Sequence, residues 1–593
     1  MTPDLNLWPI GNCQVSALVD ARGRFVWGCA PRVDGDPLFS ALLNGDSPDG
    51  GFWAIELEGC VATTQTYVRN TPVLVTRMED EAGGVVEITD FCPRFRRAGR
   101  TYRPIAWARR IVPVAGSPRI TVRLRPHIDW GARVAEPVPG SNHLRYPTDT
   151  PLRLSTDAPV GLVAAERTFR VERALTFFLG PDESFTGPLG ATVDAMLADT
   201  IHEWQHWVRG LATPPEWQDA VIRAAIALKL CQHEETGAIV AALTTSVPEA
   251  PGSGRNWDYR YCWVRDAYYT VEALNRLGAL DVLEGYLAYL RNIVDDAASG
   301  HIQPLYDVTG AGTLTERIAP DLAGYRGMGP VRRGNAACAQ IQHDAYGQIV
   351  LSSAQAFVDA RLYRPGRQAD FDALERVGER AWAKYDQPDA GLWELRTRTH
   401  VHTYSAVMCW AACDRLAKVA AAAGRPEREG VWRERGETMH ARILAAAWRP
   451  DTDTLSATFE SDERDASLLQ LLDLRFLAPD DARFLGTLAA TEAALRRGPD
   501  MLRYATADDF GEPETAFTVC SFWLIEALAL TGRRDEARAL FEEMLMRRTP
   551  SGLLSEDADF RTRELWGNFP QTYSLVGIIN SAVLLSKPWS AVL

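Results

Sequence analysis

The chain has 593 residues, of which 46% are hydrophobic and 24% are charged. This composition is typical of globular proteins and excludes extended disorder, and the length is too great for one compact core, so two or more domains are expected. The net charge of −14 disfavours nucleic-acid binding, because phosphate repels an acidic protein, whereas a neutral sugar is compatible with it.

The first part of the chain, residues 1–193, has the pattern of a β-domain. Residues 53–57 and 119–125 alternate between apolar and polar side chains, as strands do. Clusters of Gly, Pro, Asn and Asp, such as residues 44–50, interrupt the pattern and indicate turns. Many short strands at short spacing predict an antiparallel β-sandwich.

The remainder of the chain has the pattern of helices. Residues 195–210 predict one helix leading out of the sandwich, within a linker at 194–214. A helical domain is expected over 215–593. Its clearest apolar repeats, every three or four positions, lie at 219–231, 267–276, 344–362, 405–423, 516–530 and 534–546. This periodicity predicts helices and leaves open how they close on one another.

The cysteines and the N-terminal residues indicate in which cellular compartment the protein is expected. Ten scattered cysteines form no CxxC pair, and buried free thiols in a reducing compartment are expected. Residues 1–13 lack a basic region followed by an apolar stretch, and no uncharged apolar run reaches about 18 residues. A soluble cytoplasmic protein without a membrane span or cofactor is therefore expected, and homo-oligomerisation stays open.

Two glutamates in the helical region are the leading catalytic candidates. Glu394 follows Trp393, and Glu556 follows Leu554-Ser555. Cleavage of a glycosidic bond needs one carboxyl that donates a proton to the leaving oxygen, and a second that is ionised to activate water or attack the sugar. Most glutamates are solvated surface charges, so the case depends on the neighbouring motifs.

Two further segments carry polar side chains suited to sugar hydroxyls. Residues 252–266 combine four aromatics with three arginines and two aspartates. An Arg-Asp pair can hold adjacent hydroxyls, and an aromatic ring can stack on the sugar, although a structural salt bridge capped by core aromatics is equally compatible. Residues 324–335 form a glycine-rich loop with three arginines. It lacks the Gly-Lys-Ser/Thr ending of a P-loop, and a solvated basic loop is the alternative.

Two other motifs point to different chemistry. His202-Glu203-Trp204-Gln205-His206 is formally an HExxH zinc motif, but no metzincin extension follows, and no acidic residue lies within nine positions after His206. An interdomain packing helix is favoured there, and no metal site is expected. Asp509-Phe510-Gly511 resembles a kinase triplet without the accompanying kinase motifs, and we treat it as coincidental.

Taken together, these motifs resemble glycoside hydrolase family 15, which contains glucoamylase-like enzymes, glucodextranases and some bacterial trehalases. The resemblance covers most of the chain. Its specific marks occur in the family's order at residues 256–266, 324–335, 392–394, 402–405, 554–556 and 567–571. It implies an N-terminal β-sandwich, a linker helix and an (α/α)6 barrel with the active site at the barrel mouth.

The resemblance also implies roles for individual residues. Glu394 matches the general acid and Glu556 the general base of an inverting hydrolase. The matched sugar-binding positions are Tyr259, Trp263, Arg265, Asp266, Arg332 and Trp393. Trp393 is expected to desolvate Glu394 and so favour its acid role, whereas the more polar run around Glu556 suits an ionised base.

Departures from the family pattern leave the substrate open. Leu395 stands where fungal members have a second glutamate, and Met328-Gly329-Pro330 stands where many bacterial members read Ser-Arg-Pro. We expect an exo-acting α-glucoside hydrolase that releases β-glucose from non-reducing ends of a soluble oligosaccharide or disaccharide, and an α,α-trehalase is the alternative. A sugar phosphorylase or a non-catalytic carbohydrate-binding protein ranks lower, because both carboxylates are present.

Overall fold

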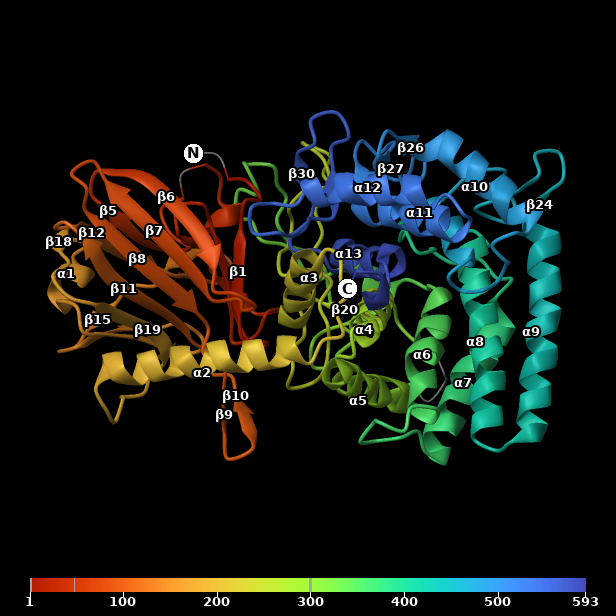
Figure 1. Ribbon diagram of the computed structural model, residues 1–593, viewed down its shortest axis with the longest axis horizontal. Helices are drawn as coiled ribbons and strands as arrows, with labels where there is room; N and C mark the ends of the chain where they lie inside the picture. Colours follow the sequence, from red (N-terminus) through yellow and green to blue (C-terminus); the bar gives the residue numbers. More distant parts are fainter. Residues whose placement is uncertain (1–2, 47, 298–300, 593) are drawn as a thin grey trace.

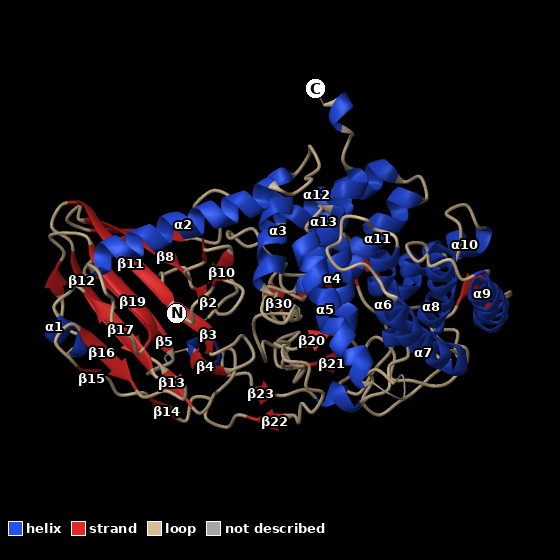
Figure 2. Ribbon diagram, turned by 90° about the horizontal axis from the view of Figure 1, so that it is seen from below, coloured by secondary structure: helices blue, strands red, loops and turns tan. Residues whose placement is uncertain are grey.

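The computed structural model describes residues 3–46, 48–297 and 301–592, and it consists of a β-sheet part followed by a helical part. Figure 1 shows the strands at one end of an elongated molecule and the helices at the other. Helix α2 (Leu189–Arg209) runs along the sheets toward the helical part, as the two views in Figures 1 and 2 agree.

Two antiparallel sheets share one apolar core and form the expected β-sandwich. Trp53 enters this core from the first sheet, and Ile88 and Trp107 enter it from the second. The predicted strands 53–57 and 119–125 are neighbours in the first sheet, as expected for alternating segments with one face in the core. The first sheet contains β1 (Trp8–Gly11), β2 (Ser16–Val19), β3 (Phe25–Ala30), β4 (Asp36–Phe39), β5 (Phe52–Leu57), β12 (Arg119–Arg125) and β18 (Phe169–Arg170). The second contains β6 (Cys60–Tyr67), β7 (Leu74–Asp80), β8 (Val85–Phe91), β11 (Trp107–Ala115), β15 (Val138–Pro139), β16 (His143–Tyr146), β17 (Leu152–Thr156) and β19 (Leu175–Pro181).

Helix α2 packs against both parts of the molecule. It begins at Leu189, earlier than the predicted start at residue 195, directly after Pro188, whose fixed φ of −59° is compatible with the position before the first helical turn. Trp204 is buried with Cys13 of the sandwich and Ile226 of the first barrel helix. This burial supports the packing role expected for the helix.

The helical part is a double ring of alternating inner and outer elements. In the part of the chain that the structure describes, six inner elements contact one another in sequence, and the last contacts the first, which closes the ring. The inner elements are α4 (Val264–Arg276), α6 (Asp344–Ala354), α8 (Thr403–Ala422), the 3-10 helix η4 (Ala466–Leu471), α11 (Thr518–Leu530) and α13 (Thr572–Leu585). The outer elements are α5 (Leu280–Asp296), α7 (Gln368–Lys384), α9 (Pro426–Ala447), α10 (Ala482–Leu495), α12 (Arg534–Met546) and α3 (Gln218–Leu230). This is the (α/α)6 barrel that the family resemblance implied.

The apolar patterns explain which elements lie inside. The inner helix α11 is buried over nearly its whole circumference, whereas α9 buries only one stripe that includes Trp432, Met439 and Ile443. Most predicted helices agree with the structure. The helix predicted over 344–362 is too long, because α6 ends at Ala354 and the chain tightens into the 3-10 turn η3 (Gln355–Phe357).

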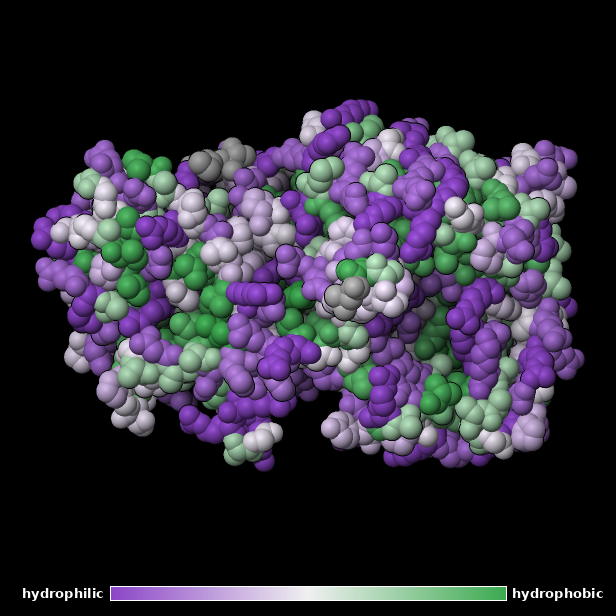
Figure 3. Space-filling model, in the orientation of Figure 1, coloured by the Kyte–Doolittle hydropathy of each residue, from purple (hydrophilic) through white to green (hydrophobic). Residues whose placement is uncertain are grey.

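The molecular surface is largely polar over the helices. On the face shown in Figure 3, hydrophilic side chains cover most of the barrel, and the larger apolar patches lie over the sandwich. Within the described ranges, no helix has both the length and the apolar character needed to cross a membrane. All ten cysteines are unpaired, as expected, but Cys60 is exposed on the edge strand β6 and does not have the predicted buried position.

Candidate active site

A cavity opens at the barrel end where the inner helices begin. It holds about 800 Å³ of space free of protein atoms and is walled by loops that precede α4, α8, α11 and α13. Six of the predicted site residues line it: Tyr259, Trp263, Arg265, Asp266, Trp393 and Glu394. The mixture of aromatic and charged side chains suits a polar ring compound.

Glu394 reaches the cavity from a strained turn. Its backbone has φ +61°, in the left-handed region that few non-glycine residues adopt. Gly391, three residues earlier, has φ +68°, and a Cβ there would lie 2.6 Å from the ring of His402. The tight turn therefore requires glycine at 391, and it directs a 21% exposed Glu394 side chain at the cavity.

Three donors hold one oxygen of the Glu394 carboxyl group. Trp263 Nε1 donates to Oε1 at 2.6 Å, and Arg265 Nη2 and Gln342 Nε2 donate to the same oxygen at 3.3 Å. The indole that contacts the carboxylate is thus that of Trp263. The indole of Trp393 donates at 2.6 Å to Asp465, although its ring also lines the cavity.

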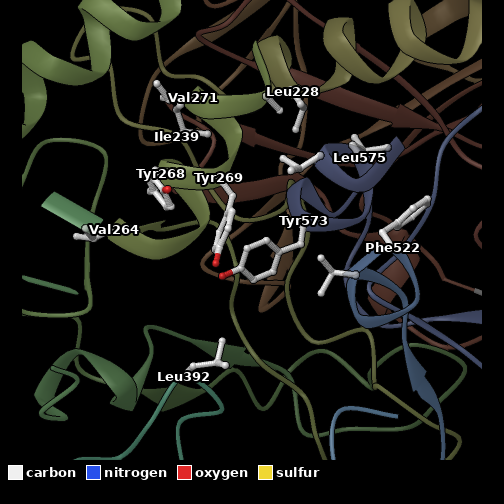
Figure 4. Close-up of a cluster of buried hydrophobic side chains, with 14 of the residues drawn as sticks. Leu228, Ile239, Val264, Tyr268, Tyr269, Val271, Leu392, Phe522, Tyr573 and Leu575 are labelled. Atoms are coloured by element: carbon white, nitrogen blue, oxygen red, sulfur yellow. The ribbon is translucent and has the colours of Figure 1, made fainter. Parts of the chain in front are cut away.

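Asp266 lines the cavity and has one buried carboxyl oxygen without a hydrogen-bond partner. Its side chain is almost fully buried, and Oδ2 has no hydrogen-bond partner in the structure, with Arg265 Nε 3.6 Å away. Burial raises the pKa of Asp266 to about 7, against the stabilising charge of Arg265. A buried acceptor without a partner is costly, so this oxygen is suited to a ligand hydroxyl. Tyr573, beside Tyr269 in Figure 4, accepts from Arg265 Nε at 2.8 Å and fixes the guanidinium.

Glu556 lies behind the cavity wall. Its residue exposure is 1%, and it does not line the cavity. The phenol of Tyr259, which does, donates to Oε1 at 2.5 Å, while Oε2 is buried without a partner. Burial, reinforced by the negative charges of Asp557 and Glu249, raises the pKa of Glu556 well above its ordinary value. The expected polar surroundings of Glu556 are therefore wrong, because residues distant in sequence bury it.

Arg332 lies outside the cavity lining. Its Nη1 donates to Glu316 at 2.9 Å, and its guanidinium lies 5.2 Å from the ring centre of Trp257, which does line the cavity. Arg332 therefore contacts the cavity residue Trp257 but does not itself line the cavity.

Several cavity residues escaped the sequence analysis. Glu249 accepts from Trp257 Nε1 at 2.9 Å and from Arg503 Nη2 at 2.7 Å, and both partners line the cavity with it. Asp508 pairs with Arg255 across the rim. Asp509 and Phe510, of the triplet treated as coincidental, are also lining residues. Asp508 and Asp509 lie close to Phe510 in the sequence, whereas Glu249 has no such neighbour.

The HExxH histidines lie far from this chemistry. His202 and His206 stack 6.3 Å apart on the exposed side of α2, and Glu203 pairs with Arg96 at 3.3 Å. Over residues 3–46, 48–297 and 301–592, no three His, Cys, Asp or Glu side chains are grouped to hold a metal ion.

Comparisons with known proteins match both parts of the chain. The family model "Glycosyl hydrolases family 15" matches residues 216–583, and the model "Trehalase-like, N-terminal" matches residues 6–173. A trehalase of Thermoplasma volcanium is 31% identical over 98% of this chain and 93% of its own length. A trehalase of Mycolicibacterium smegmatis is 30% identical over 97% of this chain and 90% of its own.

A solved structure is similar in fold over the whole chain. A bacterial glucoamylase complexed with acarbose superposes with a TM-score of 0.68, covering 98% of this chain and 92% of that one, at 12% sequence identity. The sandwich followed by an (α/α)6 barrel is thus a known arrangement.

Proposed function

The chain belongs to glycosyl hydrolases family 15, and from that membership we propose that it is an α,α-trehalase. The supporting observation is similarity to proteins named trehalase along nearly the whole chain, including a trehalase-like N-terminal domain. This favours the alternative of the sequence analysis over its leading expectation of a glucoamylase-type enzyme.

The proposed reaction is hydrolysis with inversion. Glu394 donates its proton to the glycosidic oxygen as the bond to C1 breaks. Water attacks C1 from the opposite face, and Glu556 accepts the proton that the water loses. One glucose leaves in the α form, and the attacked one is released as β-glucose. The position of Glu394 on the cavity wall supports the acid role, since the leaving oxygen must reach it.

Tyr259 links the proposed base to the cavity. Its phenol contacts Glu556 on one side and its ring lines the cavity on the other, 5.3 Å from the ring of Trp263. An attacking water that donates to the phenol oxygen of Tyr259 would therefore be linked to Glu556 by two hydrogen bonds, and its proton would reach the base as the phenol passes its own proton to Glu556. The same ring faces the positive charge that develops at C1, which an aromatic face stabilises.

Arg265 and Asp266 are the proposed grip on the attacked glucose. Asp266 offers its unpartnered oxygen to a sugar hydroxyl, and Arg265 lies beside both Asp266 and Glu394. The ring of Trp393 is a stacking surface for the same substrate. We further propose a domain division into 1–193, 194–214 and 215–593, and a reducing cytoplasmic location, which ten unpaired cysteines support.

Proton NMR tests the assignment. The purified protein is incubated separately with trehalose, maltose, isomaltose and maltotriose, with and without phosphate. We expect turnover of trehalose, with α- and β-glucose appearing in equal amounts before they interconvert. Faster cleavage of maltose or isomaltose would instead identify a glucoamylase-type enzyme. Formation of glucose 1-phosphate would identify a phosphorylase, and only α-glucose from trehalose would rule out inversion.

A further inference from the structure

The residue after Tyr259 is inserted into the N-terminal domain. The side chain of Arg260 is fully buried, although it carries a charge. Its Nη1 donates at 2.6 Å to the carbonyl of Gly35 and lies 3.4 Å from Sγ of Cys29, both in the sandwich. Its guanidinium centre lies 4.6 Å from the ring centre of Trp130.

Four residues of the sandwich form the binding site of the Arg260 side chain, which we call the socket: Cys29, Gly35, Asp36 and Trp130. Trp130 and the preceding Asp129 have φ of +57° and +55°. Both oxygens of Asp36 hold this strained turn, accepting the backbone N–H of Asp129 at 2.7 Å and of Trp130 at 2.8 Å. Such strain persists only where the surroundings enforce it, and here it places an indole face on the arginine.

The same arginine also fixes the backbone around Tyr259. Arg260 Nε and Nη2 donate to the two oxygens of Asp258 at 2.9 and 2.7 Å, so the residues on both sides of Tyr259 are tied together. The carbonyl of Tyr259 accepts the N–H of Ala242 at 3.0 Å. These contacts fix the backbone position from which the phenol of Tyr259 reaches Glu556.

We propose that Arg260 is a positioning residue through which the N-terminal domain sets the place of Tyr259 against Glu556. The sandwich then contributes to catalysis without touching the sugar. This inference rests on the proposed roles of Tyr259 and Glu556. A shift of the phenol by a fraction of its 2.5 Å hydrogen bond would weaken the contact with the base, while the other proposed sugar-binding walls, Arg265, Asp266 and Trp393, would stay in place.

A double-mutant cycle tests the inference. The variants are Arg260→Lys, which keeps the charge and loses the bidentate contact, Tyr259→Phe, and the two together. Trp130→Leu disturbs the socket from the sandwich side and serves if Arg260→Lys does not fold. The control is Arg94→Lys, because the buried Arg94 of the sandwich also joins the two domains, through Glu234, and within the described residues its contacts do not include Tyr259, Glu556 or their sequence neighbours. Folding is checked by circular dichroism and melting temperature.

We expect Arg260→Lys and Trp130→Leu to lower kcat about tenfold or more, because small misplacements of catalytic groups are costly, with KM within about twofold. In the Tyr259→Phe background, Arg260→Lys should add little, since both act through one hydrogen bond. The inference would be overturned if the reduction in kcat of the double variant equalled the product of the two single reductions. Wild-type kcat in both Arg260→Lys and Trp130→Leu would also overturn it. Full activity of Tyr259→Phe alone would instead refute the role of Tyr259. If maltose proves the substrate, the cycle is run on maltose and still decides the question.

Discussion

The phenol of Tyr259 donates a 2.5 Å hydrogen bond to the carboxyl group of Glu556, and through this contact a glutamate buried behind the wall reaches the cavity. Glu394, in contrast, lines the cavity directly. The two carboxyl groups thus differ in burial and in access to the cavity.

Replacement of the proposed acid should slow the hydrolysis of natural substrates more than that of substrates whose leaving group needs no proton. We expect Glu394→Gln to lower kcat for trehalose by about 10²- to 10⁴-fold, since a positioned proton donor contributes that much. Hydrolysis of α-glucosyl fluoride, whose leaving group needs no proton, should fall much less. Steady-state kinetics on both substrates measure the contrast. Glu543→Gln, at an exposed ion pair with Arg563, is the matched control. Equal losses on both substrates would contradict the acid role.

The pH profile should carry the signature of a buried base. Glu556 must be ionised to accept a proton, and burial raises its pKa, so kcat/KM should rise with pH at values above the ordinary glutamate pKa. The hydrogen bond from Tyr259 lowers this pKa. Tyr259→Phe should therefore move the acid limb to higher pH. An unchanged or lower-pH limb in this variant would show that Glu556 does not set it.

Ionised Asp266 should lower the free energy of unfolding while it serves to bind the sugar. Its pKa is about 7 when folded and 3.8 ordinarily, so between these values the folded protein holds a proton that the unfolded chain releases. Stability from this group is present below pH 4 and is lost as pH rises through 7. Asp266→Asn should thus raise the free energy of unfolding at pH 8 by the order of 2 kcal/mol and leave it nearly unchanged at pH 4. Calorimetry at both values measures this.

The same Asp266→Asn variant should lose most of its activity on trehalose, because an amide replaces the proposed acceptor of a sugar hydroxyl with a group that is half donor. Kinetics at pH 8 complete the comparison with calorimetry. A variant that is both less stable and fully active would contradict both roles of the buried oxygen.

The absence of a side chain at Gly567 should be needed for catalysis, in addition to the backbone conformation of this residue. It has φ +75°, and a Cβ there would lie 2.6 Å from Cβ and 2.8 Å from Oε2 of Glu556. Gly567→Ala should displace the base and lower kcat about tenfold or more. Gly498→Ala is the matched control, because Gly498 has φ +67° with open space around it. Both variants should lose about 1–2 kcal/mol of stability from the left-handed backbone, and only the first should lose activity. Equal kcat in the two would refute the steric argument.

Much of the fold was predictable because its signals are local. The strand β12 and the helix α12 match their predicted bounds, since apolar periodicity within a few turns defines each. The inner element η4 was not predicted, because a six-residue 3-10 helix is too short to show a period. Ring closure was available only through the family resemblance, since it depends on α13 meeting α4 across most of the domain.

The site was predictable where chemistry clusters in sequence. Tyr259, Trp263, Arg265 and Asp266 share one conspicuous segment and share one cavity. Glu249 and Arg503 were missed because each lies outside the motifs and joins the site only through folding, and Asp508 was missed because the adjoining triplet Asp509-Phe510-Gly511 was treated as coincidental. The burial of Glu556 was not predicted because its hydrogen-bond partner Tyr259 is 297 positions away in the sequence.

Closure of the inner ring by α13 has a consequence for protein synthesis. This helix carries Tyr573 into the cavity and fills the space between α3, α4 and α11, yet it lies at residues 572–585. A ribosome must therefore release residues 1–585 before the cavity has this wall, and we expect a nascent chain stalled before α13 to be unable to hydrolyse sugar. Chains cut before residue 572 should accordingly be inactive and exposed to proteolysis.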